Sequence, residues 1–335
     1  MIATSSCHRT FEHVQLFLTG ILAWALLAQA AESQPQPKDG ASVSASATKT
    51  SVDEEFKKLE AEDDAVQAQV DKWKQDNTEA RANGGGISED ALEKKIQAKL
   101  EPIRRAYQDF LRQHPDHPGA HLAYGCFLNE RQDETGARVE WEKALELDPQ
   151  NAAIYNNLAG SYSETGPAKK TFEYFQKAIE LKPNEAAYYH NFGTTLYVLR
   201  KSGMTYYGID EQQMFAKVID LYSNAVRLDP HNLNFAADLA QTYYSMKPLP
   251  IDAALDAWTN TLHAARSEAE REGVYVHLAR VKMLAGNLAE SRALLNLVTN
   301  ETHALPKANL LRAISARETS SDSATVPISA GEKKP

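Results

Sequence analysis

The sequence predicts an all-α fold in which short helical hairpins stack side by side, and two recurrences indicate it. Prolines recur 34 residues apart at Pro115, Pro149 and Pro183. Small residues recur at the same 34-residue interval at Gly125, Ala159 and Gly193. A unit of this length holds two helices of about 13 residues and two turns. Because no single hairpin buries its apolar face, neighbouring hairpins must stack.

Residues 1–30 predict a secretory signal peptide. The apolar run from Leu16 to Ala28 has 13 residues, short of the ~20 that span a bilayer as a helix. Ala28-Gln29-Ala30 follows the small-x-small pattern of a cleavage site. An uncleaved membrane anchor and a buried N-terminal helix remain as alternatives.

The next segments are a predicted disordered linker at 31–51, then a charged helix with a glycine-rich break at 52–87. Apolar residues in the helix follow a heptad-like seam: Phe56, Leu59, Val66, Val70 and Trp73. The seam fits either a short coiled coil or an amphipathic helix folded onto its neighbour. We expect Pro102, farther along, to kink a helix or to begin a new one.

The hairpin array is predicted at 88–316, with a disordered tail at 317–335. The predicted units and the helix that covers the last of them are 118–151, 152–185, 186–232, 233–270, 272–303 and 304–316. The third unit carries a 13-residue insertion between Arg200 and Met214.

The second unit carries a recognisable pattern: Tyr155, Leu158-Ala159, Tyr162, Thr171, Phe175, Ala178 and Pro183. The first unit repeats part of it with Gly125, Ala137, Trp141, Ala144 and Pro149, and the third with Tyr189, Phe192-Gly193, Tyr222, Ala225 and Pro230. This pattern resembles the tetratricopeptide repeat (TPR). The resemblance implies a right-handed superhelical solenoid, preceded here by the charged N-terminal helix.

The resemblance also implies a concave groove, lined by the first helices of successive units, that receives protein or peptide partners. The groove positions would be Asn129, Asn156, Gly160, Ser163, His190, Thr194, Tyr197, Gln241, Tyr244 and Arg280. Most of these side chains are neutral. Because Arg280 is the one cation among them, we do not expect the cluster of basic residues with which some family members clamp a peptide carboxyl terminus.

Tyr206 and Tyr207 in the insertion are a second candidate site. They lie between Gly203 and Gly208, so they could be exposed on a flexible loop, where tyrosines favour interfaces. Alternatively, both rings tuck against the first helix of their own unit.

His114, His117 and His121 could supply ligands to Zn²⁺. Their spacing matches no zinc-protease motif, and they straddle a turn between units. The chain also lacks G-x-S-x-G, P-loop and H-E-x-x-H motifs, so we expect neither catalysis nor a cofactor. A metal-dependent enzyme using these histidines is kept as an alternative.

Charge and targeting signals complete the functional prediction. A net charge of -9 argues against a nucleic-acid binder, whose surface is normally basic. The leading prediction is an exported, non-catalytic TPR scaffold in the periplasm or cell envelope that binds protein or peptide partners. The alternative is a membrane-tethered assembly or secretion factor that keeps its N-terminal segment, and only in that case is membrane association expected.

Overall fold

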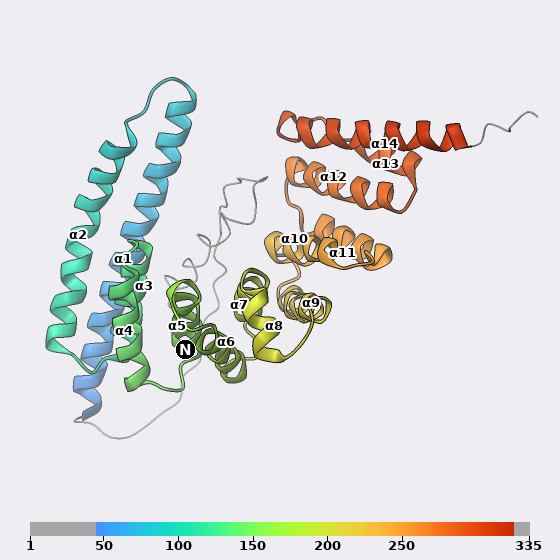
Figure 1. The fold of residues 1–335 in the computed structure, drawn as a ribbon. Helices are drawn as coiled ribbons and strands as arrows, with labels where there is room; N and C mark the ends of the chain where they lie inside the picture. The colour runs from blue at the N-terminus through green and yellow to red at the C-terminus, as the bar shows by residue number, and fades with distance from the viewer. Residues whose placement is uncertain (1–44, 325–335) are drawn as a thin grey trace, which may run out of the picture. The chain divides into compact units, whose positions relative to one another are not determined.

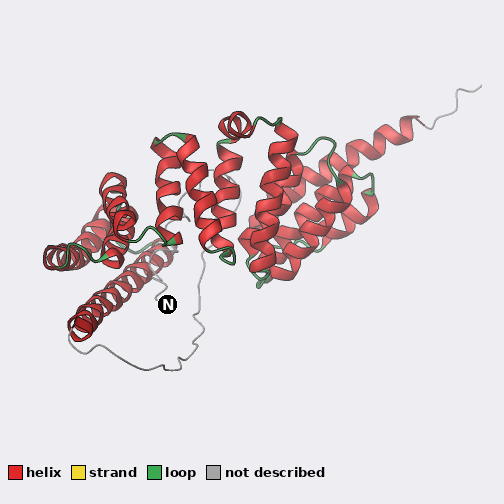
Figure 2. Ribbon diagram, turned by 90° about the horizontal axis from the view of Figure 1, so that it is seen from below, coloured by secondary structure: helices red, strands yellow, loops and turns green. Residues whose placement is uncertain are grey.

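The computed structural model describes residues 45–324, with side chains over 51–319. The predicted signal peptide, most of the predicted linker and the end of the tail lie outside these residues. Figure 2 shows helices joined by loops, and no strand occurs over residues 45–324. This confirms the predicted all-α class. Of the described helices, none has the length and apolar content needed to cross a membrane.

The helices, labelled in Figure 1, form two compact units that divide after Leu181. Unit 1 contains α1 (Ala45–Ala82), α2 (Glu89–Gln113), α3 (Pro118–Glu130), α4 (Glu134–Leu147), α5 (Ala152–Thr165) and α6 (Ala168–Leu181). Unit 2 contains α7 (Ala186–Val198), α8 (Arg200–Tyr207), α9 (Glu211–Leu228), α10 (Leu233–Thr242), the 3₁₀ helix η3 (Tyr243–Ser245), α11 (Ile251–Ala264), α12 (Glu268–Leu284), α13 (Leu288–Asn296), the 3₁₀ helix η4 (Glu301–His303) and α14 (Ala304–Ala324).

The recurring glycines lie where the two helices of a hairpin approach most closely. A Cβ atom on Gly125 of α3 would lie 2.5 Å from the indole of Trp141 in α4. In unit 2, a Cβ on Gly193 of α7 would lie 2.9 Å from the ring of Tyr222 in α9. The small residue therefore makes room for the aromatic side chain of the partner helix.

A second recurrence fixes the turn that enters each hairpin. Equivalent side chains in the first helices bond to the carbonyl oxygen of the proline six residues earlier. The three pairs are His121 with Pro115, Tyr155 with Pro149, and Tyr189 with Pro183. Each proline therefore ends one hairpin and offers an acceptor to the next.

Helix α1 packs against α2 of its own chain, and Figure 1 shows the two side by side. The seam residues Phe56 and Val70 are buried in a core that includes Leu100. Asp63 lies in the same seam and accepts a hydrogen bond from the hydroxyl of Tyr107, 2.8 Å away. Of the two alternatives, the contacts are those of an amphipathic helix folded onto its neighbour.

The helices differ from the expectations at three places. Helix α1 begins at Ala45, within the predicted linker, because the helix of the seam continues toward the N-terminus. Helix α2 runs through Pro102, so this proline does not begin a new helix, and buried Leu100 and Ile103 on either side of it pack on the same core.

Helix α14 extends to Ala324, beyond the predicted end at 316. Leu310 and Ile314 bury one face of this helix against α12 and α13. Farther along, Glu318 pairs with Arg292 of α13 at 2.6 Å. This long-range ion pair holds a stretch that was predicted to be disordered.

Candidate protein-binding surface

Contacts between first helices bring the predicted groove residues of unit 2 together. His190 Nε2 of α7 lies 2.8 Å from Asp238 Oδ2 of α10. The hydroxyl of Tyr197, also on α7, lies 3.2 Å from Ser245 Oγ of η3. We name the six predicted residues on these helices the first-helix strip: His190, Thr194, Tyr197, Gln241, Tyr244 and Arg280.

The strip continues from η3 to α12. The hydroxyl of Tyr244 donates to the carbonyl oxygen of His277 at 3.3 Å. The guanidinium carbon of Arg280 lies 5.7 Å from the centre of the Tyr244 ring. The ring of His277 stacks on Trp258 of α11, with centroids 4.0 Å apart. Side chains from three successive first helices are thus held in a fixed register.

Burial divides the strip into two parts. His190 and Thr194 are only 6% and 5% exposed, and Thr194 Oγ1 lies 3.0 Å from the hydroxyl of Tyr222. Tyr197, Gln241, Tyr244 and Arg280 are half-buried. The first two residues therefore join helices, whereas the other four can also meet a partner.

Burial also keeps the aromatic part of the strip uncharged. It raises the pKa of Tyr244 to about 12, against a smaller opposing effect of Arg280. Burial, assisted by the charge of Arg280, lowers the pKa of His277 to about 3. Near neutral pH, Tyr244 is therefore a phenol and His277 a neutral imidazole.

Three residues that contact the first-helix strip were not predicted from the sequence: Asp238, Ser245 and His277. Asp238 and Ser245 lie three and four residues from Gln241, and His277 lies three before Arg280. They therefore share helix faces with predicted residues. Helical spacing was a signal that could have found them.

The predicted groove residues of unit 1 interact mainly with nearby parts of the chain. The buried Asn156 donates from Nδ2 to Asn157 Oδ1 at 3.3 Å. Ser163 Oγ donates to the carbonyl oxygen of Gly160 at 2.6 Å within α5. Asn129 is half-buried near the end of α3. Unit 1 presents fewer of the predicted side chains for a partner than unit 2 does.

The insertion forms a helix, so the expectation of a flexible loop is wrong. Tyr206 and Tyr207 are half-buried on α8, with ring centroids 4.8 Å apart in an edge-to-face arrangement. The ammonium of Lys217 on α9 lies 4.4 Å from the centre of the Tyr207 ring. The helix ends at Gly208, whose φ of +65° is in the left-handed region.

The three histidines of the first turn take different structural positions. His117 caps α3, its Nδ1 accepting from the backbone N–H of Ala120 at 3.0 Å. The ring of His114 packs on Phe110, with centroids 4.8 Å apart. His121 Nδ1 lies 2.6 Å from Glu140 Oε2. Over residues 51–319, no three His, Cys, Asp or Glu side chains group to hold a metal ion.

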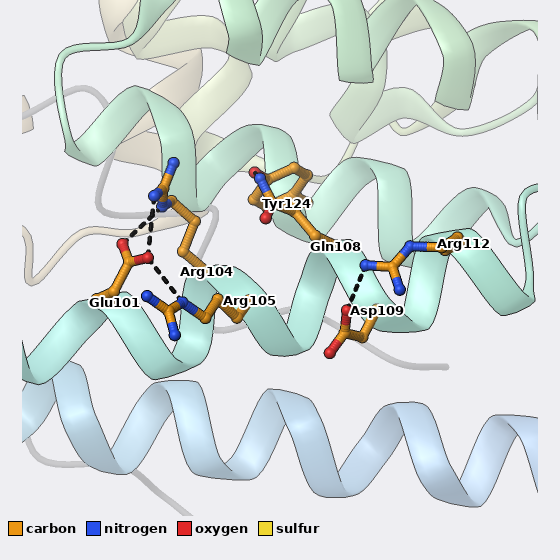
Figure 3. Close-up of polar contacts among 7 residues, drawn as sticks. All are labelled: Glu101, Arg104, Arg105, Gln108, Asp109, Arg112 and Tyr124. Carbon is orange, nitrogen blue, oxygen red and sulfur yellow. Dashed lines mark hydrogen bonds and ion pairs between the residues drawn. The ribbon is translucent and has the colours of Figure 1, made fainter.

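A charged cluster lies on both sides of Pro102 on α2 (Figure 3). Glu101 accepts hydrogen bonds from Arg104 and Arg105, of which the bond from Arg104 contributes most to lowering the pKa of Glu101 to about 2. Gln108 donates to the hydroxyl of Tyr124 at 3.0 Å and so connects α2 to α3. The ion pairs are exposed and three or four residues apart, so they support the helix only modestly.

Comparison with solved structures finds several helical proteins. MamA is 18% identical over 53% of this chain and 95% of its own, with a TM-score of 0.42. YrrB, described as a TPR protein with an unusual peptide-binding site, is 14% identical over 64% of this chain and 99% of its own, with a TM-score of 0.48. PilF of Pseudomonas aeruginosa is 19% identical over 61% of this chain and 87% of its own, with a TM-score of 0.45.

Comparisons of the sequence itself find a single family model. No curated protein matches the chain. A family model described as TPR repeat matches residues 128–166. This stretch runs from the end of α3 to the end of α5 and includes Trp141 and Pro149 of the 34-residue pattern. Residues 128–166 therefore match a TPR repeat, and the stacked hairpins, with their close contacts between glycine and aromatic residues, have the fold that the TPR resemblance implies.

Proposed function

We propose that this TPR protein is an exported, non-catalytic scaffold that binds a protein or peptide partner in the cell envelope. TPR arrays act through the extended surfaces that their stacked hairpins create. The signal-like N-terminal sequence supports export. The first-helix strip supports binding of a partner on unit 2.

The observation that carries the proposal is the linkage of three first helices by the strip. Bonds from Tyr197 to Ser245 and from Tyr244 to His277 hold α7, η3 and α12 in register. A surface fixed in this way loses little conformational freedom on binding. Tyrosine and arginine are also enriched at protein interfaces, and the strip offers both beside Gln241.

Site-specific crosslinking tests the binding surface directly. A photo-crosslinking amino acid replaces Gln241 in the full chain, expressed in its own cells and irradiated. We expect a discrete crosslinked product in the envelope fraction. The matched control places the same group at Arg312, which is exposed on α14. Equal products at both positions, or none at Gln241, would contradict binding at the strip.

Sequencing of the mature N-terminus tests export and separates it from tethering. Cleavage after Ala30 should give a chain that starts near Ala31 and fractionates with the envelope contents. A chain that keeps residues 16–28 would instead support the membrane-tethered assembly or secretion factor. Elemental analysis of the same preparation addresses the third alternative, since stoichiometric zinc would favour a histidine-based enzyme.

A further inference from the structure

We propose that Arg280 receives an aspartate or glutamate side chain from an extended segment of the partner, and that Leu284 receives an apolar residue two positions away. This inference rests on the proposed function and specifies its partner. Arg280 and Leu284 lie one helical turn apart on α12.

Arg280 is a half-buried cation without an anionic partner. No ion pair or hydrogen bond joins it to another residue in the part of the chain with described side chains. Its guanidinium lies over the face of the Tyr244 ring. Arg292 shows the usual arrangement in this unit, because its guanidinium donates to both carboxylate oxygens of Glu318. A partly desolvated charge is costly unless it is paired.

The groups around Arg280 do not neutralise its charge. Tyr244 and His277 are titratable side chains at this corner of the strip, and burial keeps both uncharged near neutral pH. Asp238, the carboxylate on α10, is engaged by His190 at 2.8 Å. A carboxylate that binds beside Arg280 would therefore meet a positive charge that no neighbouring carboxylate neutralises, on a guanidinium that lies over the ring of Tyr244.

Arginine geometry favours this kind of ligand. The planar guanidinium donates two parallel hydrogen bonds to one carboxylate, and such charge-assisted bonds are stronger than neutral ones. A single arginine provides one such fork. We therefore assign an internal acidic side chain as the ligand instead of a peptide terminus held by several basic residues.

Leu284 adds an apolar contact at a defined distance. Its side chain is 43% exposed, and residues four apart on a helix are neighbours separated by about 5–6 Å. In an extended peptide, residues i and i+2 point to the same side and lie about 6.6 Å apart. The two spacings differ by only about 1 Å, so the partner segment should pair an acidic residue with an apolar one two positions away.

Selection from a random peptide library tests the proposal. Random 12-residue peptides, displayed as fusions without a free carboxyl terminus, are panned against the immobilised full chain. We expect enrichment of Asp or Glu with an apolar residue at i±2, relative to the unselected library. Arg280→Gln should abolish the acidic enrichment and weaken a selected synthetic peptide by about tenfold. Arg312→Gln on α14 serves as the matched control and should change neither result.

The outcomes separate the two proposals. Selected peptides without acidic enrichment, or equal binding to Arg280→Gln, would overturn the role of Arg280 while leaving peptide binding intact. Failure to select any peptide would remove the binding function and this inference with it. A thermal melt of Arg280→Gln that matches the unsubstituted chain shows that lost enrichment is not lost folding.

Discussion

His121 Nδ1 lies 2.6 Å from Glu140 Oε2, which joins α3 to α4 at the start of the first hairpin. The other ring nitrogen of His121 lies 2.8 Å from the carbonyl oxygen of Pro115. Both partners can accept, so the protonated imidazolium form of the ring can donate to both at once. Burial would lower the pKa of His121, but the bonds to Glu140 and Pro115 together raise it above 6.5.

The first prediction concerns the pH dependence of this hairpin. Because the folded-state pKa of His121 is raised, its stabilisation is complete below the ordinary value of 6.5 and is lost as pH rises through the folded value. His121→Tyr keeps the bond to Pro115 that Tyr155 makes at the equivalent position. We expect the urea midpoint to fall between pH 6 and pH 9 in the unsubstituted chain and to fall less in His121→Tyr. Parallel profiles would show that His121 is not the titrating group.

The second prediction concerns Glu272 on α12, whose contribution to stability is lost as pH falls and not as it rises. Its carboxylate accepts from the backbone N–H groups of Thr299 and Asn300, at 2.7 and 2.6 Å. The Asn300 bond is the largest cause that lowers the pKa of Glu272 below 4.5, against the opposing effect of burial. The stabilisation is therefore present above pH 4.5 and is lost as pH falls through the folded value.

Hydrogen exchange measures this effect locally. In Glu272→Gln, which keeps the shape but not the charge, the amides of Thr299 and Asn300 should exchange about tenfold faster at pH 7, since hydrogen bonds to charged groups contribute ~1.5–3 kcal/mol. The amides of α4 provide the internal control. Unchanged exchange at Thr299 and Asn300 would show that the carboxylate does not hold this loop.

The third prediction concerns the close approach at Gly125. Replacing glycine by alanine inside a helix gains up to about 1 kcal/mol of propensity. Here the new methyl group would lie 2.5 Å from Trp141, a buried ring whose Nε1 donates to the carbonyl oxygen of Leu122. Overpacking costs about 1–3 kcal/mol, so we expect Gly125→Ala to lower the free energy of unfolding.

The next hairpin suggests the compensating change. Its equivalent positions are Ala159 and Phe175, an alanine opposite a smaller aromatic ring, and both are buried. Gly125→Ala combined with Trp141→Phe should therefore recover part of the loss in urea denaturation. If the double variant is as unstable as the sum of the single ones, the clash with Trp141 is not the cause.

The fourth prediction compares two tyrosine hydroxyl groups that connect α2 to its neighbours. The Tyr107 hydroxyl donates to the buried Asp63 at 2.8 Å, whereas the Tyr124 hydroxyl accepts from the exposed Gln108 at 3.0 Å. Removing a partner from a buried polar group costs about 1–3 kcal/mol. Tyr107→Phe should therefore lower the free energy of unfolding clearly more than Tyr124→Phe. Equal losses would imply that Asp63 finds another donor or water.

The 34-residue recurrence predicted packing well because it acts through local geometry. Gly125 and Trp141 are 16 residues apart, as are the equivalent residues Ala159 and Phe175. Two helices and a turn place such pairs at one crossing point wherever the spacing repeats. The same spacing gave the resemblance to the TPR without any knowledge of side-chain contacts.

Features outside the recurrence could not be predicted in this way. Helix α8 has only eight residues, too few to show helical periodicity in the sequence. The bonds of His190 to Asp238 and of Tyr197 to Ser245 each join residues 48 positions apart. Such pairs depend on the register between successive hairpins, which the lengthened third unit shifts away from 34.

Helix α14 sets a limit to the growth of the repeat series. It covers the last hairpin with Leu310 and Ile314, while Asn309 and Arg312 lie on its exposed side. An additional repeat grafted after this helix would meet charged and amide groups where it needs an apolar surface to pack against. Lengthening the protein by engineering would therefore require excising α14 first and restoring it after the new terminal hairpin.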